Sequence, residues 1–317
     1  MLTEDVKQYI ISSFGLISDK GYQLLKLSDG YSEAEVYILE VNGARRQRDL
    51  GTFILKIIDL KSENDSDKNE AEKTRDIYEK ANNFRKHLVK IKYEKVIENK
   101  LVMILSFTFD GKFSSILLAQ IKIDNQCKLL RDVSYDLLKK LNYGSIENTS
   151  ECSIISSLCL HKLQKDGNFI CRMQEYVREV EYPALNIKGI VLPNPYYYIV
   201  SSEILTDILK EKNIRFIKGF NHGDLHQKNI MISRDYMDYV IIDYDKFETN
   251  FLLFDQAYLE LSSYIQCSDE WDFEKWMKAL EYMFRTDNGE DDNVEFSEII
   301  HIEASIREGI HQWYEEE

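Results

Sequence analysis

Proline is scarce in this chain. The 317 residues contain only three, and two of them stand close together in Leu192-Pro193-Asn194-Pro195. That segment is therefore the clearest break between regular elements. The chain also has no run of about 18 apolar residues, so we expect no membrane-spanning helix. Its first five residues lack the basic start and apolar core of a signal peptide, and none is expected.

Cysteine is sparse as well, and its five copies are scattered without a C-x-x-C pair. An odd and scattered set does not favour a disulfide framework or a zinc ribbon. We therefore expect reduced thiols, mostly filling the core, in a cytoplasmic protein.

Positive charge is in the minority. The sequence has 40 lysines and arginines against 55 aspartates and glutamates, a net charge of −15. This sign argues against a surface that coats nucleic acid, and no nucleic-acid partner is expected. It is compatible with a cationic substrate, although acidic charge also serves solubility alone. Apolar residues make up 44% of the chain, enough for one large soluble domain or two lobes.

The segment 220–258 carries most of the chemical information. It begins with the sequence H-G-D-L-H-Q-K-N over 222–229, which includes Asp224 and Asn229. Two short apolar runs follow, and the second ends at Asp243. Asp255 closes the segment.

The two apolar runs, 230–232 and 239–242, predict a β-hairpin with its turn near 233–235. A hairpin of this length returns Asp243 to the side of Asp224 and Asn229. Two carboxylates and one amide oxygen would then converge at one end of a small sheet. These are hard oxygen ligands of the kind that Mg²⁺ takes together with substrate phosphates.

This segment resembles the catalytic core of the kinase-like phosphotransferases, specifically the aminoglycoside phosphotransferase and choline kinase branch. In that branch the catalytic loop has the sequence H-G-D-x-x-x-x-N, and the metal-binding strand ends in I-D. A later motif, F/Y-D-x-A, corresponds here to Phe254-Asp255-Gln256-Ala257. Typical protein kinases write H-R-D and D-F-G, followed by a longer activation segment that ends in A-P-E. Here no A-P-E occurs, and only twelve positions separate Asp243 from Asp255.

The resemblance implies an α+β, bilobal, protein-kinase-like fold. Residues 1–109 would form the N-terminal nucleotide-binding lobe, a small antiparallel sheet with one main helix. Residues 110–317 would form the larger, mostly helical catalytic and substrate-binding lobe. Periodicity predicts helices at 3–14, from Glu70 to about His87, at 128–141, 256–266, 269–284 and 294–314, with a mainly helical pattern over 112–215.

A glycine-containing turn leads into a strand over 28–39. In the resembled family this place holds a phosphate-covering loop, commonly G-x-S-G-A-x-V, which Gly30, Ser32, Ala34 and Val36 match. Glu33 stands where the second glycine is usual, and a carboxylate there repels phosphates unless it points away. Taken alone, the stretch is equally well explained as a hairpin turn.

Lys56 is the only charge inside the apolar run 53–58. A lysine there is either a solvent-facing edge residue or a buried, paired one. The resemblance implies a phosphate-binding lysine held by a glutamate of the next helix. Helical phase places Glu70 on the buried stripe, with Glu72 as the fallback, while two solvated helix charges remain the alternative.

The resemblance also assigns roles to further residues. Asp224 would accept or orient the proton of the acceptor hydroxyl, and Asn229 and Asp243 would bind Mg²⁺ that bridges the ATP phosphates. His222 would brace the loop and Asp255 would cap its backbone groups. The adenine would lie at a hinge formed by Ser106, Phe107 and Thr108.

The function implied is Mg²⁺-dependent transfer of the γ-phosphate of ATP, or of GTP, to a hydroxyl group of a small molecule. The acceptor would be aminoglycoside-like, choline-like or similar, and the oligomeric state stays open. Two other functions are compatible with these motifs. One is a catalytically weak kinase-like protein that binds nucleotide or a partner, as Glu33 suggests, and the other is a protein kinase.

Two different metal sites are also conceivable. The spacing of His222 and His226 would allow zinc binding, although the glycine between them argues against the helix that such sites use. Asp243 and Asp245 form the D-x-D of metal-dependent glycosyltransferases, which is a weak signal alone. Within the kinase-like interpretation, Asp245 is either a second metal contact or, as we favour, a surface residue.

Overall fold

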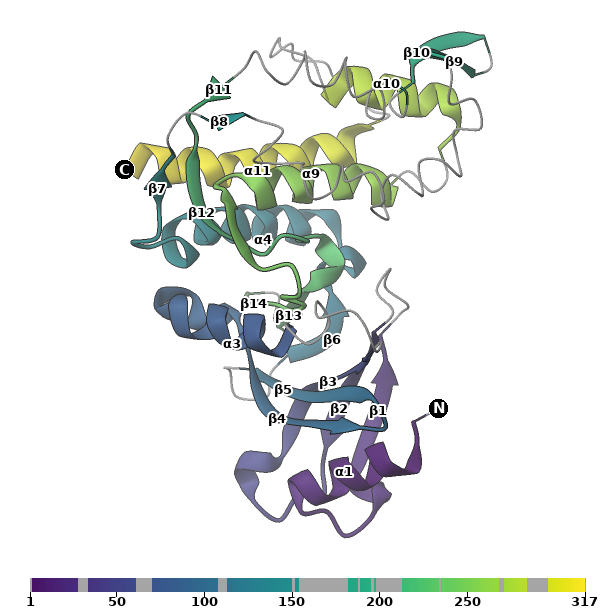
Figure 1. The fold of residues 1–317 in the computed structure, drawn as a ribbon, viewed down its shortest axis with the longest axis vertical. Coiled ribbons are helices and arrows are strands. Elements are labelled where there is room, and N and C mark those ends of the chain that lie inside the picture. The colour runs from purple at the N-terminus through teal and green to yellow at the C-terminus, as the bar shows by residue number, and fades with distance from the viewer. Residues whose placement is uncertain are drawn as a thin grey trace. The chain divides into compact units, whose positions relative to one another are not determined.

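The computed structural model describes residues 2–27, 34–60, 70–107, 113–149, 152–153, 182–187, 189–194, 197, 213–233, 235, 237–267, 271–283 and 296–316. Contacts divide the chain into two compact units. The first consists of residues 1–144, 220–248 and 253–317, and the second of residues 145–219 and 249–252. Figure 1 shows the elements of both. The predicted division into lobes at residue 109 is a different one and stays a prediction.

The first unit begins with a five-stranded antiparallel sheet, as predicted. Its strands lie in the order β1 (Tyr22–Lys26), β2 (Glu35–Val41), β3 (Gly51–Asp59), β5 (Lys100–Phe107) and β4 (Val89–Ile97). Strands β4 and β5 are joined by a two-residue turn, Glu98 and Asn99, which have φ angles of 46° and 64°. The small-lobe topology of the kinase-like fold is therefore confirmed.

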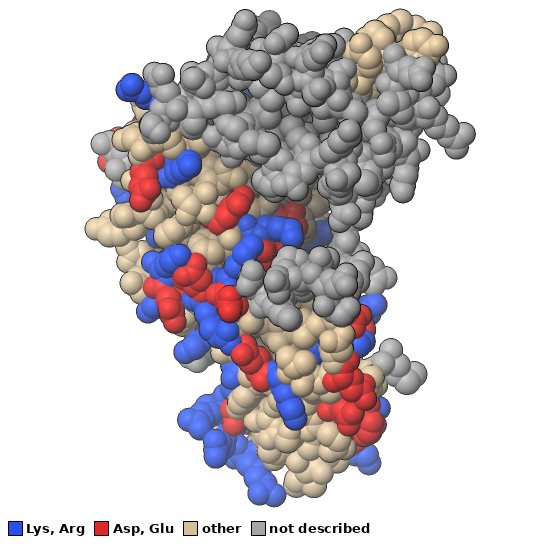
Figure 2. Space-filling model, in the orientation of Figure 1, with Lys and Arg blue, Asp and Glu red and all other residues tan. Residues whose placement is uncertain are grey.

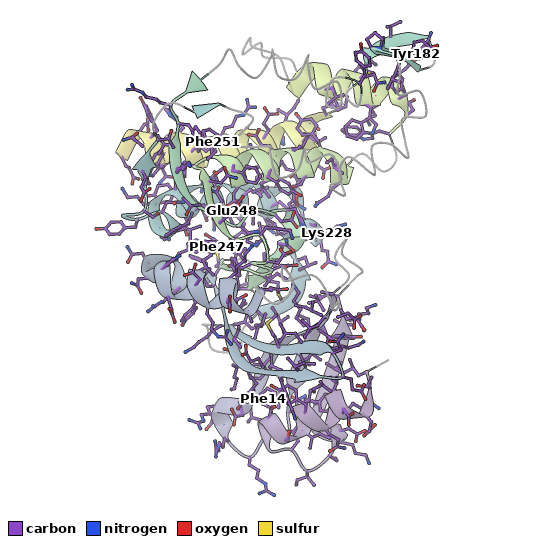
Figure 3. The ribbon with its side chains drawn as sticks, viewed as in Figure 1. Phe14, Tyr182, Lys228, Phe247, Glu248 and Phe251 are labelled. Carbon is purple, nitrogen blue, oxygen red and sulfur yellow. The ribbon has the colours of Figure 1, made fainter. Side chains whose placement is uncertain are left out.

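The two faces of this sheet have different partners. Side chains alternate along a strand, so Phe53, Leu55 and Ile57 of β3 share one face. That face packs against helix α1 (Glu4–Phe14), which buries Val6, Ile10 and Phe14 at a spacing of four residues. Phe14, labelled in Figure 3, lies with its ring centroid 4.9 Å from that of Phe53. The opposite face carries Ile54 and Lys56.

Helix α3 (Glu70–Lys80) covers the Lys56 face and buries Glu70, Ala71, Thr74 and Ile77. The predicted end near His87 is wrong, because α-helix stops at Lys80 and a 3₁₀-helix, η3 (Asn82–His87), continues the chain. Two adjacent asparagines, which are poor helix formers, follow the break. The Arg85 side chain donates to the carbonyl oxygen of Tyr78 at 2.7 Å and so satisfies a group at the helix end.

A three-stranded sheet follows in the order β14 (Tyr239–Ile241), β13 (Ile230–Ser233) and β6 (Phe113–Leu117). The predicted hairpin is confirmed, with Ile230 opposite Ile241 and Ile232 opposite Tyr239. The Ser233 hydroxyl closes its turn by accepting the backbone N–H of Asp238 at 2.9 Å. A short 3₁₀-helix, η4 (Leu118–Gln120), follows β6.

Four helices complete the first unit in its described residues: α4 (Ile123–Asp136), α9 (Phe254–Cys267), α10 (Phe273–Met283) and α11 (Ser297–Glu316). The helix predicted at 128–141 begins earlier, and its last turn, η5 (Leu137–Leu141), is π-helical. Helices α4 and α11 pack closely at Gly309, because a Cβ there would collide with the carbonyl oxygen of Arg131.

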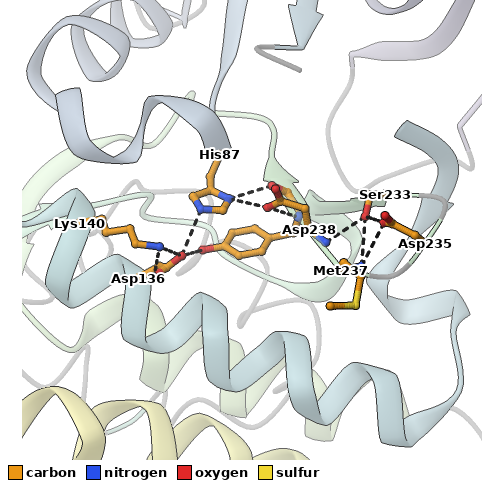
Figure 4. Close-up of polar contacts among 8 residues, drawn as sticks. His87, Asp136, Lys140, Ser233, Asp235, Met237 and Asp238 are labelled. Carbon is orange, nitrogen blue, oxygen red and sulfur yellow. Dashed lines mark hydrogen bonds and ion pairs between the residues drawn. The ribbon is translucent and has the colours of Figure 1, made fainter. Parts of the chain in front are cut away.

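A buried polar network joins η3 to the hairpin and to α4 (Figure 4). The His87 ring stacks on Tyr239 with centroids 4.1 Å apart, and its Nδ1 lies 3.0 Å from the Tyr239 carbonyl oxygen. On its other side, Nε2 lies 3.1 Å from Asp136 Oδ2 without the alignment of a hydrogen bond. Asp136 also accepts from the Tyr239 hydroxyl at 3.0 Å and pairs with Lys140 at 2.6 Å.

The second unit shows short strands in its described residues. They are β7 (Glu147–Asn148), β8 (Cys152–Ser153), β9 (Ala184–Ile187), β10 (Ile190–Pro193), β11 (Asn213–Ile214) and β15 (Glu248–Phe251), and β12 (Ile217–Asn221) begins there. Strands β9 and β10 pair as a hairpin whose turn is closed by the N–H of Gly189 on Asn186 Oδ1. Within the stretch 112–215, predicted to be mainly helical, the described residues form helix α4 with η5 and several short strands, while 154–181 and 198–212 lie outside the described residues.

Two properties of the described part of the chain bear on its surroundings. None of its helices combines the length and the apolar character needed to cross a membrane. On the face drawn in Figure 2, acidic and basic side chains are interspersed over the described surface.

Candidate functional site

A cavity of about 720 Å³ in the first unit is lined by several of the described residues that the sequence singles out. Polar side chains at its wall come from β3, from the loop 222–229 (the HGD loop) and from the end of the hairpin: Lys56, Asp224, His226, Lys228, Asn229, Asp243, Asp245 and Lys246. Apolar side chains come from both sheets and their flanks: Leu27, Ala34, Val36, Ile54, Leu105, Leu117 and Ile242. Helix α9 adds Tyr258, Ser262, Ile265 and Gln266.

Lys56 lies between two carboxylates at the wall of this cavity. Its Nζ is 2.6 Å from Glu70 Oε1 and 2.7 Å from Asp243 Oδ1. The Lys56 side chain is only 5% exposed, so water screens these contacts poorly. Glu70 is therefore the partner of Lys56, whereas Glu72 is exposed.

The charges of this cluster do not balance, and the pKa values reflect this. Burial alone would lower the pKa of Lys56, but the two carboxylates hold it above its ordinary range. Burial would raise the pKa of Asp243, but attraction to Lys56 keeps it below its usual value. One ammonium cannot compensate both acids, and burial raises the pKa of Glu70 to about 7 against the opposing attraction of Lys56.

Helix α3 positions the hairpin end through a second contact. The Lys73 ammonium donates to the carbonyl oxygen of Asp245 at 2.7 Å. Asp243 itself has a φ of 71°, a left-handed conformation that aspartate tolerates better than most residues. The Tyr244 hydroxyl donates to the carbonyl oxygen of Ile241 at 2.8 Å and stabilises this sharp turn. Asp245 lies at the cavity wall with its carboxylate 2.8 Å from the ammonium of Lys246.

The first residues of α9 hold the HGD loop. Asp255, which is buried, accepts the backbone N–H groups of His222 at 2.7 Å and of Gly223 at 3.0 Å with its two carboxylate oxygens. Burial raises the pKa of Asp255, although these two donors and the nearby imidazole oppose the rise. The carboxylate of Asp255 thus fixes the backbone that leads into Asp224.

His222 links the loop to the hairpin. Its Nε2 lies 2.8 Å from the carbonyl oxygen of Ile242, and its Nδ1 accepts the N–H of Asp224 at 3.3 Å. These partners assign the tautomer with the proton on Nε2. Both nitrogens are engaged, so the zinc site considered for His222 and His226 would require breaking the loop. Among the described residues, no group of three or more His, Cys, Asp or Glu is arranged to hold a metal by itself.

Steric packing explains why the H-G-D motif has glycine at its second position. Gly223 has a φ of 85°, and a Cβ built there would collide with the carbonyl oxygen of Lys246. The backbone of Lys246 therefore occupies the space into which the side chain of an arginine, as in an H-R-D motif, would project from this position. This packing explains why glycine, as in H-G-D, stands here rather than the arginine of protein kinases.

Asp224 and Asn229 face the same cavity from the two ends of the HGD loop. Asn229 is 7% exposed, and its Nδ2 donates to the carbonyl oxygen of Asp224 at 3.0 Å. This leaves the amide oxygen Oδ1 as the side chain's acceptor. A carboxylate from Asp243 and an amide oxygen from Asn229 are hard donors that suit Mg²⁺, and nucleotide phosphates and water would have to complete its octahedral shell.

Other predicted site residues either fall outside the described residues or do not line the cavity. Gly30, Ser32 and Thr108, together with Glu33, fall outside the described residues. Ser106 and Phe107 end β5, where the Ser106 hydroxyl donates to the carbonyl oxygen of Lys90 at 3.3 Å and Phe107 is buried in the core. In this strand it is the Leu105 side chain that reaches the cavity wall.

The sequence analysis missed Tyr258, Lys228 and Lys246 at the cavity wall. Burial, with a contribution from the nearby Asp224 carboxylate, raises the pKa of Tyr258. Its position three residues after Asp255 places both on one face of a helix, and this spacing was the available signal. The two lysines had no distinguishing pattern. His226, left unassigned, has a buried Nδ1 without a partner, and burial lowers its pKa despite the nearby Asp224.

Together, the antiparallel sheet with its lysine, the glutamate on the following helix, and the loop-and-hairpin that carries Asp224 and Asp243 define a kinase-like fold. More specifically, the chain belongs to the family described as Ternary complex associated domain 9, which matches residues 133–309, more than half of its length. A search of curated proteins gave no match.

Several solved structures are similar at low identity. Aminoglycoside-3'-phosphotransferase of type VIII has a TM-score of 0.45 and 15% identity, covering 91% of this chain and 94% of that one. Plasmodium vivax ethanolamine kinase has a TM-score of 0.44 and 12% identity, covering 99% and 84%. An aminoglycoside phosphotransferase from Streptomyces rimosus, in complex with ADP and streptomycin, has a TM-score of 0.42 and 13% identity, covering 96% and 99%. None of these similarities assigns a substrate to this chain.

Proposed function

We propose that this protein is a Mg²⁺-dependent phosphotransferase that moves the γ-phosphate of ATP, or of GTP, to a hydroxyl group of a small molecule. The observation that carries the proposal is the convergence of four polar residues on one cavity, with a fifth paired to one of them. Lys56 and Asp243 are in direct contact there, Glu70 holds Lys56 from behind, and Asp224 and Asn229 share the wall.

The cavity offers separate places for the two halves of a nucleotide. Its apolar side chains from both sheets suit the flat faces of a base, as Val36, Ile54 and Leu105 illustrate. Its lysines suit the phosphates, and Lys56 would contact the α and β phosphates. Gly30, Ser32 and the hinge residues 106–108 would add backbone contacts to phosphate and adenine.

Asn229 and Asp243 would hold Mg²⁺. When bound, the ion neutralises charge on the phosphates and holds them in line for displacement. Metal binding by Asp243 would have to replace part of its contact with Lys56, which frees the ammonium for the phosphates.

Asp224 would act on the acceptor. The acceptor oxygen forms a bond to the γ-phosphorus as the bond from that phosphorus to the bridging oxygen of ATP breaks and ADP leaves. The hydroxyl proton passes to the Asp224 carboxylate. An ordinary carboxylate is a weak base for an alcohol, so orientation of the hydroxyl is the larger part of its contribution.

The acceptor is a hydroxyl-bearing small molecule such as an aminoglycoside-like or choline-like compound. The scattered cysteines support a reducing compartment, the cytoplasm.

The first test is nucleotide binding. We would measure the melting temperature with and without Mg²⁺-ATP and Mg²⁺-GTP for wild type, Asp243→Ala and the matched control Asp76→Ala, whose side chain is exposed on α3. A Mg²⁺-dependent stabilisation that Asp76→Ala keeps and Asp243→Ala loses supports the proposal. No shift with either nucleotide well above millimolar concentration contradicts it.

The second test is turnover. ADP release would be followed with water, aminoglycosides, choline-like amines and sugars as acceptors, for wild type and Asp224→Asn. Turnover that depends on Asp224 supports the proposal. Binding without turnover favours a kinase-like nucleotide-binding protein, and transfer to serine peptides favours a protein kinase.

A further inference from the structure

Helix α3 contacts the residues of the candidate site at two points that are one turn apart. Glu70 Oε1 lies 2.6 Å from the ammonium of Lys56 on β3. Lys73 Nζ donates to the carbonyl oxygen of Asp245 at 2.7 Å, across 172 positions of the chain. Residues three apart on a helix are neighbours on its surface. One side of α3 therefore holds the lysine of the sheet with a carboxylate and the end of the hairpin with an ammonium.

The carbonyl group that Lys73 holds belongs to a tight turn after Asp243. Asp243 has a φ of 71°, which a residue other than glycine adopts only at a cost in free energy. The Phe247 N–H donates to the carbonyl oxygen of Tyr244 at 3.1 Å and closes the turn. The ammonium of Lys73 adds a charge-assisted hydrogen bond from outside the turn, and such bonds are stronger than neutral ones. The direction of the Asp243 side chain thus depends on a contact made from α3.

Lys56 competes with a metal ion for the Asp243 carboxylate, because its Nζ lies 2.7 Å from Asp243 Oδ1. A turn that was free to relax would let this carboxylate stay in the cluster with Lys56. A turn held at Asp245 keeps the carboxylate at the cavity wall, where it is oriented before a metal binds. Contacts that orient a metal ligand in this way raise metal affinity, because less freedom is lost on binding.

We propose that Lys73 is a positioning residue that holds the turn after Asp243 and so directs the Asp243 carboxylate toward Mg²⁺. The inference rests on the proposed function and adds to it a residue that lies outside the motifs. The described residues that line the cavity do not include Lys73, which acts through the backbone of Asp245. Its removal should therefore weaken the use of Mg²⁺ more than it weakens contact with the nucleotide itself.

The test compares Lys73→Met with Lys80→Met. Both lysines are on α3, but the Lys80 ammonium pairs with Asp76 at 2.6 Å in an exposed contact. The affinity for ATP would be measured by calorimetry over a series of Mg²⁺ concentrations and in EDTA. We expect Lys73→Met to raise the Mg²⁺ concentration needed for half-maximal affinity about ten- to hundredfold, as for other supports of metal ligands. Its affinity for ATP in EDTA should stay within about twofold of wild type, and Lys80→Met should match wild type in both conditions.

Lys73→Arg keeps a charged donor and should recover most of the Mg²⁺ dependence, which a need for any long side chain at this position would not require. A general effect of positive charge would instead weaken ATP binding equally with and without Mg²⁺. An equal loss of this kind, or an unchanged Mg²⁺ requirement in Lys73→Met, would overturn the role of Lys73.

A second measurement needs no ligand. Hydrogen exchange of the turn, followed at the Phe247 N–H, should be about tenfold faster in Lys73→Met than in wild type and in Lys80→Met. Equal exchange in the three proteins would overturn the hold of Lys73 on the turn. Faster exchange in Lys73→Met, together with a wild type that binds no nucleotide, would overturn the proposed function, and Lys73 would then be a structural support of the turn alone.

Discussion

Lys56 Nζ lies 2.7 Å from Asp243 Oδ1 although 187 positions separate the two residues in the chain. The same ammonium lies 2.6 Å from Glu70, so one lysine of the N-terminal sheet joins a helix and the end of a distant hairpin. Burying two carboxylates with one cation costs desolvation free energy. The attraction within an ion pair offsets this cost only when the charged groups are held in contact. The cluster therefore links folding of the sheet to the geometry of the cavity.

Replacing Lys56 by Met should be strongly destabilising. It leaves Glu70 and Asp243 buried without their cation, and breaking such a pair costs about 3–5 kcal/mol. Urea unfolding at pH 7.5 measures this loss. Lys100→Met is the control, because Lys100 pairs with Asp59 at a partly exposed site on the same sheet and should lose no more than about 1 kcal/mol. Equal losses in the two variants would contradict the buried-cluster account.

Glu70 should make stability depend on pH in an unusual direction. Its pKa is about 7 in the folded protein against an ordinary value of 4.5, so the folded state binds the proton more tightly. Stability then falls as pH rises from about 4.5 to 7 and is level above that window. The change is on the order of 3 kcal/mol. The pKa of Asp243 is lowered, so this carboxylate becomes protonated, and the free energy of unfolding falls as a result, only below about pH 4.

The measurement is a series of urea unfolding curves between pH 4.5 and 7.5. Glu70→Gln should flatten the dependence in this window, because it removes the titrating carboxyl. Glu72→Gln makes the same chemical change two residues away at an exposed position and should keep the wild-type slope. A slope that Glu72→Gln removes and Glu70→Gln retains would show that the wrong glutamate has been assigned.

These residues show which parts of the site were predictable. The resemblance chose Lys56, helical phase chose Glu70, and hairpin length returned Asp243 to the HGD loop. Each of these inferences uses a motif or a spacing within one short stretch of the chain. Tyr258 was missed because its place at the cavity wall depends on how α9 lies against the loop. The same holds for the early end of α3, where long-range packing of Phe84 and Leu88 keeps the apolar spacing after α-helix has stopped.

The network around His87 was also invisible in the sequence, because its members come from three distant segments. Asp136 pairs with Lys140 and lies beside His87, and these contacts outweigh burial and lower its pKa. Its contribution to stability is therefore present above about pH 4 and is lost as pH falls below that value. Asp136→Asn should cost about 3–5 kcal/mol at pH 7.

Asp132→Asn is the matched control for this change. Asp132 lies one turn earlier on α4, and its carboxylate is 41% exposed. We expect its loss to stay within about 0.5 kcal/mol, as for most surface substitutions. Urea unfolding at pH 7 compares the two variants, and similar values would mean that the buried network adds little to the stability of the fold.

Gly223 gives the sharpest steric test. Gly223→Ala places a Cβ at a φ of 85° and against the carbonyl oxygen of Lys246. Gly144→Ala places a Cβ at a φ of 75° with no atom within 4 Å, so it carries the backbone strain alone. That strain is about 1–2 kcal/mol, and overpacking adds about 1–3 kcal/mol at Gly223. The difference between the two free energies of unfolding isolates the collision.

Because the Gly223 backbone is held by Asp255 and adjoins Asp224, its displacement should also lower turnover, whereas Gly144→Ala should leave turnover unchanged. Equal stability losses would mean that the loop can move away from Lys246, and the steric reason given for the H-G-D motif would then be wrong.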